Sequence, residues 1–406
     1  MNTTSSLHSR LDSAQQKFFI AGAAGLALCA LGGFANPIQF FHSYLLAFMF
    51  WAGIALGCAA IVMLHHLTGG AWGFGIRRML EAGTRTFLLL AVLFLPLLFG
   101  LTRLYLWAQP ELVAADPILQ YKHLYLNVPF FLVRAAVYFA AWNLLGFFLS
   151  KWSAEQDATG DPRVASRLEA LSGPGLIIYG LTVSFASIDW VMSLEPHWFS
   201  TIYGMMFMVS QALAAMSFVI VVAMLLADSP PLSAAISPAQ FHDLGNLLFT
   251  FTMLWAYLSF SQFLLVWSGN LQSEIPWYAS RASGGWAGVA LFLIIFHFAV
   301  PFLLLLSRTV KRRMRVLAAV AAGLLFMGLV DLFWLITPAF HRQGPRPHWM
   351  DLAAPIGVGG IWMAGFLSQL KGRPLVPLHD TGNEAGIPEG ARIHGAPMRG
   401  ASSHGH

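Results

Sequence analysis

Residues 187–227 read SIDWVMSLEPHWFSTIYGMMFMVSQALAAMSFVIVVAMLLA and give the first strong indication of the fold class. From residue 199 onward this stretch has no charged side chain, and it exceeds the roughly 20 residues that a helix needs to cross a bilayer. Similar runs recur along the 406-residue chain, which is 57% hydrophobic and only 10% charged. Soluble domains have about 25% charged residues. We therefore expect an all-α, polytopic membrane protein.

Hydropathy and loop-forming residues predict ten transmembrane helices. Their approximate limits are 18–35, 40–66, 84–108, 124–150, 174–192, 199–227, 240–268, 284–307, 314–338 and 350–370. The runs lack the period-two alternation of a membrane β-barrel. The sequence predicts a cytoplasmic N-terminal segment at 1–17, a polar cytoplasmic loop with a short possible helix at 153–172, and a disordered cytoplasmic tail at 371–406.

A weak internal repeat indicates how the helices are grouped. The second predicted span opens FFHSYLLAFMF (40–50), and the sixth opens WFSTIYGMMFM (198–208). Within a transmembrane domain at 18–370, we expect two four-helix bundles as parallel repeats, at about 40–192 and 199–338, plus two extra helices.

The distribution of Lys and Arg predicts the orientation. The loops on the side of the N-terminus hold most of the 23 basic residues, and the opposite side holds only Lys122, Arg281, Arg342 and Arg346. Because cytoplasmic loops of membrane proteins are enriched in Lys and Arg, both termini are expected in the cytoplasm. The net charge of +5 thus belongs to membrane loops, and we expect no nucleic-acid partner.

Ionisable groups within the predicted spans are the first candidates for a site, because they are costly in a bilayer. Arg134 lies about ten residues inside the fourth span and should pair with an acid, either Asp189 or Asp331. Such a pair could lock the bundle or take part in function. Glu195 and His197 follow Asp189 in the stretch 187–204, which forms the joint between the fifth and sixth predicted spans at the outer face.

Histidines supply the second group of candidates. His297 lies mid-span four residues before Pro301, which should kink the helix and leave a polar pocket. Its imidazole could relay protons, bind haem iron or satisfy a neighbour. At the cytoplasmic ends of spans, His65, His66, His242 and Asp243 could form the inner mouth of a proton path or simply be polar span ends.

Motifs of soluble enzymes and metal sites are absent from the sequence. We find no P-loop, dinucleotide-binding glycine motif, HExxH or nucleophile elbow. The two cysteines, Cys29 and Cys58, lie in apolar spans without metal-binding spacing. The chain is therefore expected to bind no metal.

Three groups of strings resemble a known family. They are SIDWVMSLEPHWFSTIYG (187–204), FHDLGNLLFTFTMLWAYLSFSQFLLVWSGN (241–270) with EIPWY (274–278), and FFHSYLLAFMFWAGIALGC (40–58) with HHLTGGAWG (65–73). The chain resembles the NrfD-like, polysulfide-reductase-type membrane subunits of alternative complex III, a quinol:cytochrome c oxidoreductase, and most closely the second, ActF-type subunit. The resemblance covers the second to tenth spans and leaves out residues 1–17 and 372–406.

The resemblance implies a ten-helix subunit in a bacterial inner membrane. It implies partners as well: a sibling NrfD-like subunit, an iron–sulfur subunit and c-type cytochrome subunits, which together oxidise quinol and pass electrons to an acceptor. The clusters and haem c would reside in those partners. This chain, which lacks cluster and haem ligands, would bind no cofactor itself.

Three functions remain open at this point. The leading hypothesis is a structural subunit with a proton path through ten residues, namely His65, His66, Arg134, Asp189, Glu195, His197, His242, Asp243, His297 and Asp331. A second hypothesis makes the chain itself the quinol-oxidising subunit, with quinol held by Asp189, Trp190, His197 and Trp198. The third is an independent secondary transporter built from parallel repeats.

Overall fold

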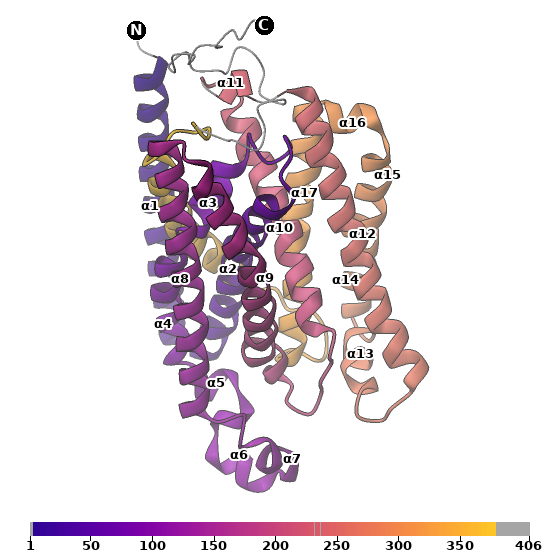
Figure 1. The fold of residues 1–406 in the computed structure, drawn as a ribbon. Coiled ribbons are helices and arrows are strands. Elements are labelled where there is room, and N and C mark those ends of the chain that lie inside the picture. Colours follow the sequence, from indigo (N-terminus) through magenta and orange to yellow (C-terminus); the bar gives the residue numbers. More distant parts are fainter. Residues whose placement is uncertain (1–2, 231, 236, 379–406) are drawn as a thin grey trace, which may run out of the picture.

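Long, roughly aligned helices make up most of the computed structural model, which describes residues 3–230, 232–235 and 237–378 (Figure 1). No strand occurs within these ranges. In the same ranges, nine helices are long and apolar enough to cross a membrane, and a bent helix pair raises the number to ten if it counts as one span. The expected all-α, multi-pass membrane fold is confirmed.

Eight single helices account for most of the crossings: α1 (Thr3–Ala35), α2 (Pro37–Thr68), α8 (Val128–Thr159), α9 (Pro162–Trp190), α10 (Tyr203–Leu226), α12 (Pro238–Gly269), α17 (Met314–Ile336) and α18 (Met350–Lys371). A further crossing runs without interruption through α14 (Trp286–Leu293), the π-helical η3 (Ile294–Ala299) and α15 (Val300–Leu306). The bent pair is α3 (Arg77–Thr84) and α4 (Phe87–Leu98).

Short elements complete the described chain: α5 (Leu101–Leu104), η1 (Leu106–Ala108), α6 (Pro110–Ala115), α7 (Pro117–Lys122), η2 (Met192–Leu194), α11 (Leu232–Ala235), α13 (Ile275–Arg281), α16 (Arg308–Arg312) and η4 (Thr337–Ala339). Figure 1 places α6, α7 and α13 at one end of the bundle and α11 and α16 at the other.

Local sequence explains where four of the long helices begin. Each starts with a polar residue whose side chain accepts a hydrogen bond from the first turn, followed by proline within two positions: Asn36 for α2, Asn127 for α8, Asp161 for α9 and Ser237 for α12. The cap satisfies a main-chain N–H that has no helical partner, and proline has no N–H to leave unsatisfied there. These signals therefore fix the helix starts independently of the membrane.

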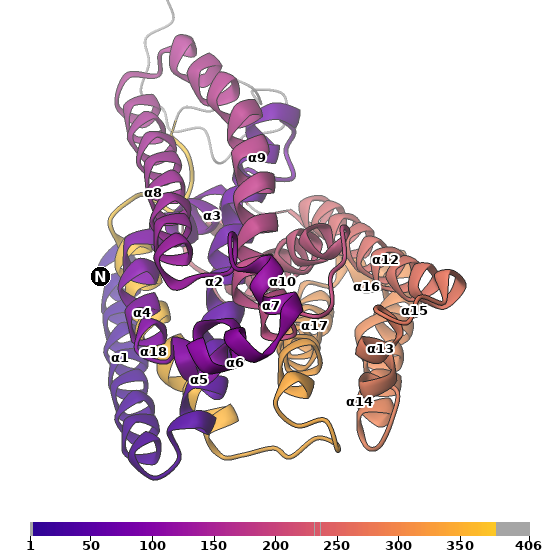
Figure 2. The ribbon, with the colours of Figure 1, turned by 90° about the horizontal axis from the view of Figure 1, so that it is seen from below.

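The crossings form two groups that meet along α2 and α10. In one group α2 contacts α4 and α9, and α8 contacts both α4 and α9; in the other, α10 contacts α12 and α17, while the α14–α15 crossing contacts both of these. Figure 2 shows α2 and α10 near the centre, with α8 and α9 on one side and α12 to α15 on the other. The additional helices α1 and α18 pack against each other and against α2. A repeat relationship between the two groups stays a prediction.

The third span differs from the continuous helix predicted at 84–108. Its first part, α3, meets α4 at an angle of 41°, and α4 ends at Leu98. At the break the Thr86 hydroxyl donates to the Gly83 carbonyl at 2.6 Å. A side-chain bond of this kind competes with the helical main-chain pattern and favours a bend.

The polar loop predicted at 153–172 is wrong. α8 continues to Thr159 and α9 begins at Pro162, so the linker is only Gly160 and Asp161. Gly160 adopts a left-handed conformation with φ 63°, which ends a helix at little cost. This segment is polar because α8 and α9 both extend beyond the apolar part of the bundle.

The described ends of the chain lie at the same end of the bundle. α1 already begins at Thr3 within the segment predicted at 1–17, and the Lys371 ammonium at the end of α18 contacts Asp12 and Gln15 on α1. Of the predicted tail at 371–406, residues 379–406 lie outside the described part.

Candidate functional site

Arg134 and Asp189 form a buried ion pair in the first group of helices. Arg134 donates from Nε to Asp189 Oδ2 at 2.8 Å and from Nη2 to Oδ1 at 2.9 Å. Tyr138, one turn further along α8, donates its hydroxyl to the same carboxylate at 2.7 Å. Of the two acids that the sequence offered to Arg134, the partner is thus Asp189, whose side chain is completely buried.

This pair has the geometry of a structural connection between α8 and α9. Both carboxylate oxygens are bonded, and a third guanidinium nitrogen donates to the Tyr125 carbonyl at 2.9 Å. The Tyr125 ring also lies 3.9 Å from the guanidinium carbon, a favourable cation–π distance. Asp189 is therefore fully engaged in the contact between α8 and α9.

The two other ionisable residues of the joint are paired as well. Glu195 accepts a 2.7 Å hydrogen bond from Arg281, a nearly fully buried residue of α13 that also donates to the Leu335 carbonyl. His197 lies partly exposed with Nε2 2.6 Å from Asp116, and this hydrogen bond lowers the pKa of the Asp116 carboxyl. The joint is therefore tied to three other segments of the chain.

The four residues proposed to hold quinol do not share one cavity. Trp190 packs on Phe94 inside the first group of helices and borders a cavity of about 10 Å³. Trp198 stacks on Trp277 at 4.4 Å and borders a different cavity of about 230 Å³. Asp189 is engaged by Arg134, and His197 points to Asp116.

In the second group of helices, Asp331 and His297 both contact Trp255. The indole Nε1 of Trp255 donates to Asp331 Oδ2 at 3.1 Å, and its ring stacks on the imidazole at 4.2 Å with only 3° between the planes. The three residues come from α17, η3 and α12. Among the described residues, no cation pairs with Asp331.

Residues Ile294–Ala299, which include His297, form a π-helix, and the crossing continues through Pro301 to Leu306. Both a π-helical turn and a proline interrupt the regular main-chain hydrogen bonds of a helix. His297 is 1% exposed, and neither ring nitrogen makes a hydrogen bond of normal geometry within the described chain, although the main chain of Met327 lies near the ring. A buried imidazole with unused nitrogens can still bind a water molecule.

A small cavity next to His297 supplies room for one water. Its volume is about 30 Å³, above the roughly 10–15 Å³ that a cavity needs to hold one water. Ser210 and Gln211 of α10 also line it. Gln211 in turn accepts a 2.9 Å hydrogen bond from Tyr179 of α9, so polar groups extend from His297 to the contact between the two groups.

At the opposite end of the bundle, the four predicted inner-mouth residues lie in two pairs. His66 Nδ1 is 3.1 Å from the Ser172 hydroxyl, and the neighbouring His65 ring packs against Trp72. His242 lies within 3.7 Å of the Asp243 carboxylate.

One loop connects these pairs. Trp72 belongs to the segment between α2 and α3, and the adjacent Ala71 carbonyl accepts a 3.2 Å hydrogen bond from Gln240 at the start of α12. Further along α12, Asn246 is bonded to Lys311 at 2.7 Å and approaches His242 at 3.4 Å.

Several residues of these clusters were not predicted from the sequence: Tyr138, Tyr179, Gln211, Trp255 and Arg281. One signal was available in the spacing. Asp189 and Asp331 each precede a proline by seven residues, Pro196 and Pro338, near the outer end of corresponding helices. If the predicted repeat holds, the two acids occupy matching positions, and they have different partners: Arg134 for Asp189 and Trp255 for Asp331.

Within the described ranges, no group of three or more His, Cys, Asp or Glu side chains could hold a metal ion. No protein-family model matches this chain, and no curated protein matches it. The assignment of function rests on the residues of the chain itself.

Proposed function

We propose that the protein is a cofactor-free membrane subunit of a respiratory quinol:cytochrome c oxidoreductase of the alternative complex III type, and that its second group of helices conducts protons. The assignment to this complex is supported by the resemblance of residues 40–58, 187–204 and 241–270 to its NrfD-like subunits. The proposed setting is a bacterial inner membrane with both termini cytoplasmic, next to a sibling NrfD-like subunit, an iron–sulfur subunit and c-type cytochrome subunits.

The contrast between Asp189 and Asp331 carries the proton-conducting part of the proposal. Asp189 has a bidentate arginine, whereas Asp331 accepts one bond from a neutral indole. An acid buried at membrane depth without a cation gains little from staying charged and can therefore take up and release a proton. His297, which stacks on the face of Trp255, provides a second exchangeable site at the middle of its span.

The contacts favour a proton path with fewer residues than the ten proposed from the sequence. Asp331 serves as the outer site and His297 as the central one, with Trp255 fixing their positions and a water in the cavity by Gln211 as the next carrier. His242 and Asp243 lie at the inner end of α12. The four ion-paired residues Arg134, Asp189, Glu195 and His197 then hold the structure together.

Asp331→Asn is expected to abolish proton movement while leaving electron transfer intact. Asparagine keeps the shape and the Trp255 bond but cannot release a proton near neutral pH. The measurement is the ratio of protons moved to electrons transferred by the purified complex in vesicles, with quinol as donor. His297→Gln should give the same result, because glutamine cannot carry a proton either.

Asp351→Asn is the matched control, since Asp351 is an outer-end acid already bonded by Gln39 and Ser43. It should leave the ratio unchanged. An unchanged ratio in both Asp331→Asn and His297→Gln would exclude these residues from the path. Loss of quinol oxidation in Asp331→Asn with normal assembly would instead place Asp331 in the redox reaction.

Membership of the complex is tested by purification of the tagged full chain from its host in mild detergent. We expect quinol-dependent reduction of cytochrome c and covalently bound haem in the same fraction. Purification without haem or iron–sulfur polypeptides, but with solute uptake in vesicles, would favour the secondary transporter.

The competing proposal, quinol oxidation by this chain, has its own test. Asp189, Trp190, His197 and Trp198 would have to face one quinol, yet two of them are held in separate ion pairs. A photoreactive quinone is therefore expected to label the sibling subunit. Labelling of this chain at Trp198, which borders the 230 Å³ cavity, would restore the alternative.

A further inference from the structure

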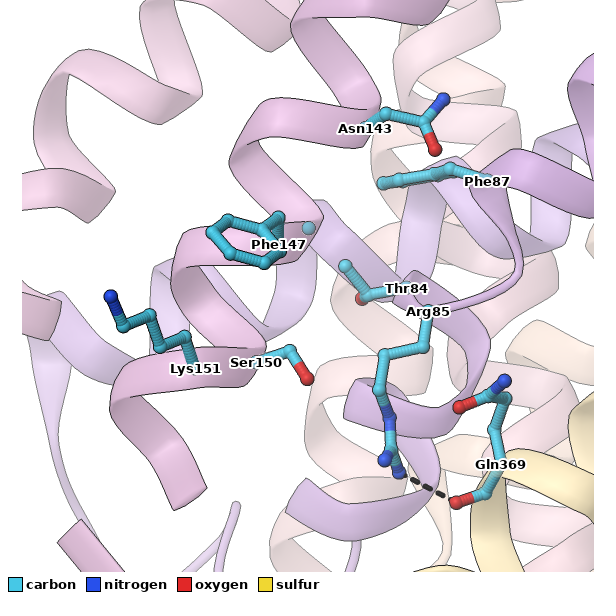
Figure 3. Close-up of a pocket in the computed structure, with 9 residues that line it drawn as sticks. Thr84, Arg85, Phe87, Asn143, Phe147, Ser150, Lys151 and Gln369 are labelled. Carbon is cyan, nitrogen blue, oxygen red and sulfur yellow. Dashed lines mark hydrogen bonds between the residues drawn. The ribbon is translucent and has the colours of Figure 1, made fainter. Parts of the chain in front are cut away.

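A crevice with cationic walls opens between the α3–α4 bend, α8 and α18. Its volume is about 320 Å³, at the lower end of the roughly 300–1,000 Å³ typical of small-molecule sites. Thr84, Arg85 and Phe87 come from the bend, Asn143 to Lys151 from α8, and Gln369 from α18 (Figure 3). None of these residues belongs to the proposed proton path.

Positive charge around the crevice exceeds the negative charge available to neutralise it. Glu81 and Asp157 are already bonded by Arg78, and Glu81 also accepts from Arg77 at 2.9 Å. Arg85 donates only to the main-chain carbonyls of Glu81 and Gln369, at 3.4 and 2.7 Å. Lys151, an exposed lining residue, has no ion pair within the described chain. Both lining cations therefore lack a carboxylate.

Arg373 adds a third undercompensated cation directly behind the crevice wall. It donates to the carbonyl and hydroxyl of the lining residue Ser150 at 2.7 and 3.0 Å. Its other terminal nitrogen is buried without a hydrogen bond and approaches Glu81 only to 3.8 Å. Burial lowers the pKa of the Arg373 guanidinium, although Glu81 opposes this effect. A bound anion would offset the positive charge of all three cations.

The crevice lies where the apolar surface of the bundle meets its polar end. Phe147, which lines it, is 59% exposed, and Leu144 and Leu88 beside it are 58% and 70% exposed. Gln369 lies in the last turn of α18, at the end of the bundle where α1 begins. In a bilayer crossed by these helices, phospholipid head groups lie at the polar ends of the apolar runs, with acyl chains next to the apolar side chains.

We propose that this crevice binds the head group of an anionic phospholipid, with Arg85 and Lys151 on opposite sides of the crevice and an acyl chain lying along Phe147. Polar lining groups such as Asn143 and Ser150 can hydrogen-bond the head group. Basic pockets between transmembrane helices recognise anionic head groups in this way. The exposed apolar wall favours a lipid over a free anion, because inorganic phosphate has nothing to place there.

The test is lipid binding by the purified full-length chain in detergent, followed by native mass spectrometry during titration with phosphatidylglycerol. The double variant Arg85→Gln/Lys151→Gln is expected to weaken binding about 30-fold, at roughly 1 kcal/mol per removed charge. Lys151→Gln alone, at an exposed position, should weaken it about fivefold and covers the case in which the double variant misfolds. Arg85→Lys with Lys151→Arg should retain binding, because both charges remain.

Arg312→Gln is the control, an exposed cation on α16 at the same end of the bundle. It should leave phosphatidylglycerol binding unchanged. Equal loss in this control, unchanged binding in the Lys151→Gln and double variants, or equal binding of phosphatidylcholine would each overturn the proposal. Equal occupancy by inorganic phosphate at the same concentration would overturn the lipid assignment.

Discussion

Arg134→Met is expected to lower the free energy of unfolding by about 3–5 kcal/mol, because it leaves a buried carboxylate without its cation. Asp189 is fully buried and keeps the Tyr138 hydroxyl, a neutral donor, when the arginine is removed. Methionine preserves most of the side-chain volume, so the loss comes from the charge and not from a cavity. Unfolding by a denaturing detergent in mixed micelles measures it.

Two further variants show whether the buried charge is the cause. Arg167 and Glu155 form an ion pair at 3.3 Å with exposed side chains, so Arg167→Met should cost at most about 1 kcal/mol. Adding Asp189→Leu to Arg134→Met should recover part of the loss, because no unpaired charge remains. A double variant less stable than Arg134→Met would contradict this account.

Gly57→Ala is expected to destabilise the contact between α2 and α10 by about 1–3 kcal/mol, as overpacking of a tight core does. A Cβ at Gly57 would lie 2.1 Å from the Gln211 carbonyl oxygen and 2.7 Å from the Ala215 Cβ. The obstacle is helix main chain, which cannot rotate away, so α2 and α10 must separate. Because these helices join the two groups, the loss of stability should affect both groups of helices.

Gly53→Ala provides the comparison one turn earlier on the same helix. Its Cβ would meet only the flexible Gln211 side chain, at 3.4 Å. Alanine is normally about 1 kcal/mol better than glycine inside a helix, so this variant should be neutral or stabilising. Thermal unfolding of both variants in the same detergent measures the difference. Equal stability would show that the helices separate without cost.

The membrane fold could be predicted from sequence because hydropathy reports the length of apolar runs directly. Nine of the predicted crossings have a helix counterpart within the described residues. The third, predicted as a continuous helix at 84–108, is divided into α4, α5 and η1, with breaks at Phe99–Gly100 and Tyr105 that hydropathy does not report. The predicted loop at 153–172 was wrong because polar residues also suit helices that extend into water.

The partners of buried charges could be predicted only as alternatives. Hydropathy gives the depth of Arg134 but not the rotation of its helix, so Asp189 and Asp331 are equal candidates for its partner. The contact between α8 and α9 in the structure selects Asp189. Trp255 was hidden among many aromatic residues, although it touches both Asp331 and His297. Such residues become visible only when helices from distant parts of the sequence are placed side by side.

The two-residue turn between α8 and α9 makes the chain convenient for imaging. α8 has 32 residues and is about 48 Å long at 1.5 Å per residue, whereas a bilayer core is about 30 Å thick. The excess forms a stiff hairpin that ends at Gly160 and Asp161. A folded tag inserted there would be a rigid fiducial for electron microscopy, and an antibody against it would report on which side of the membrane the hairpin lies.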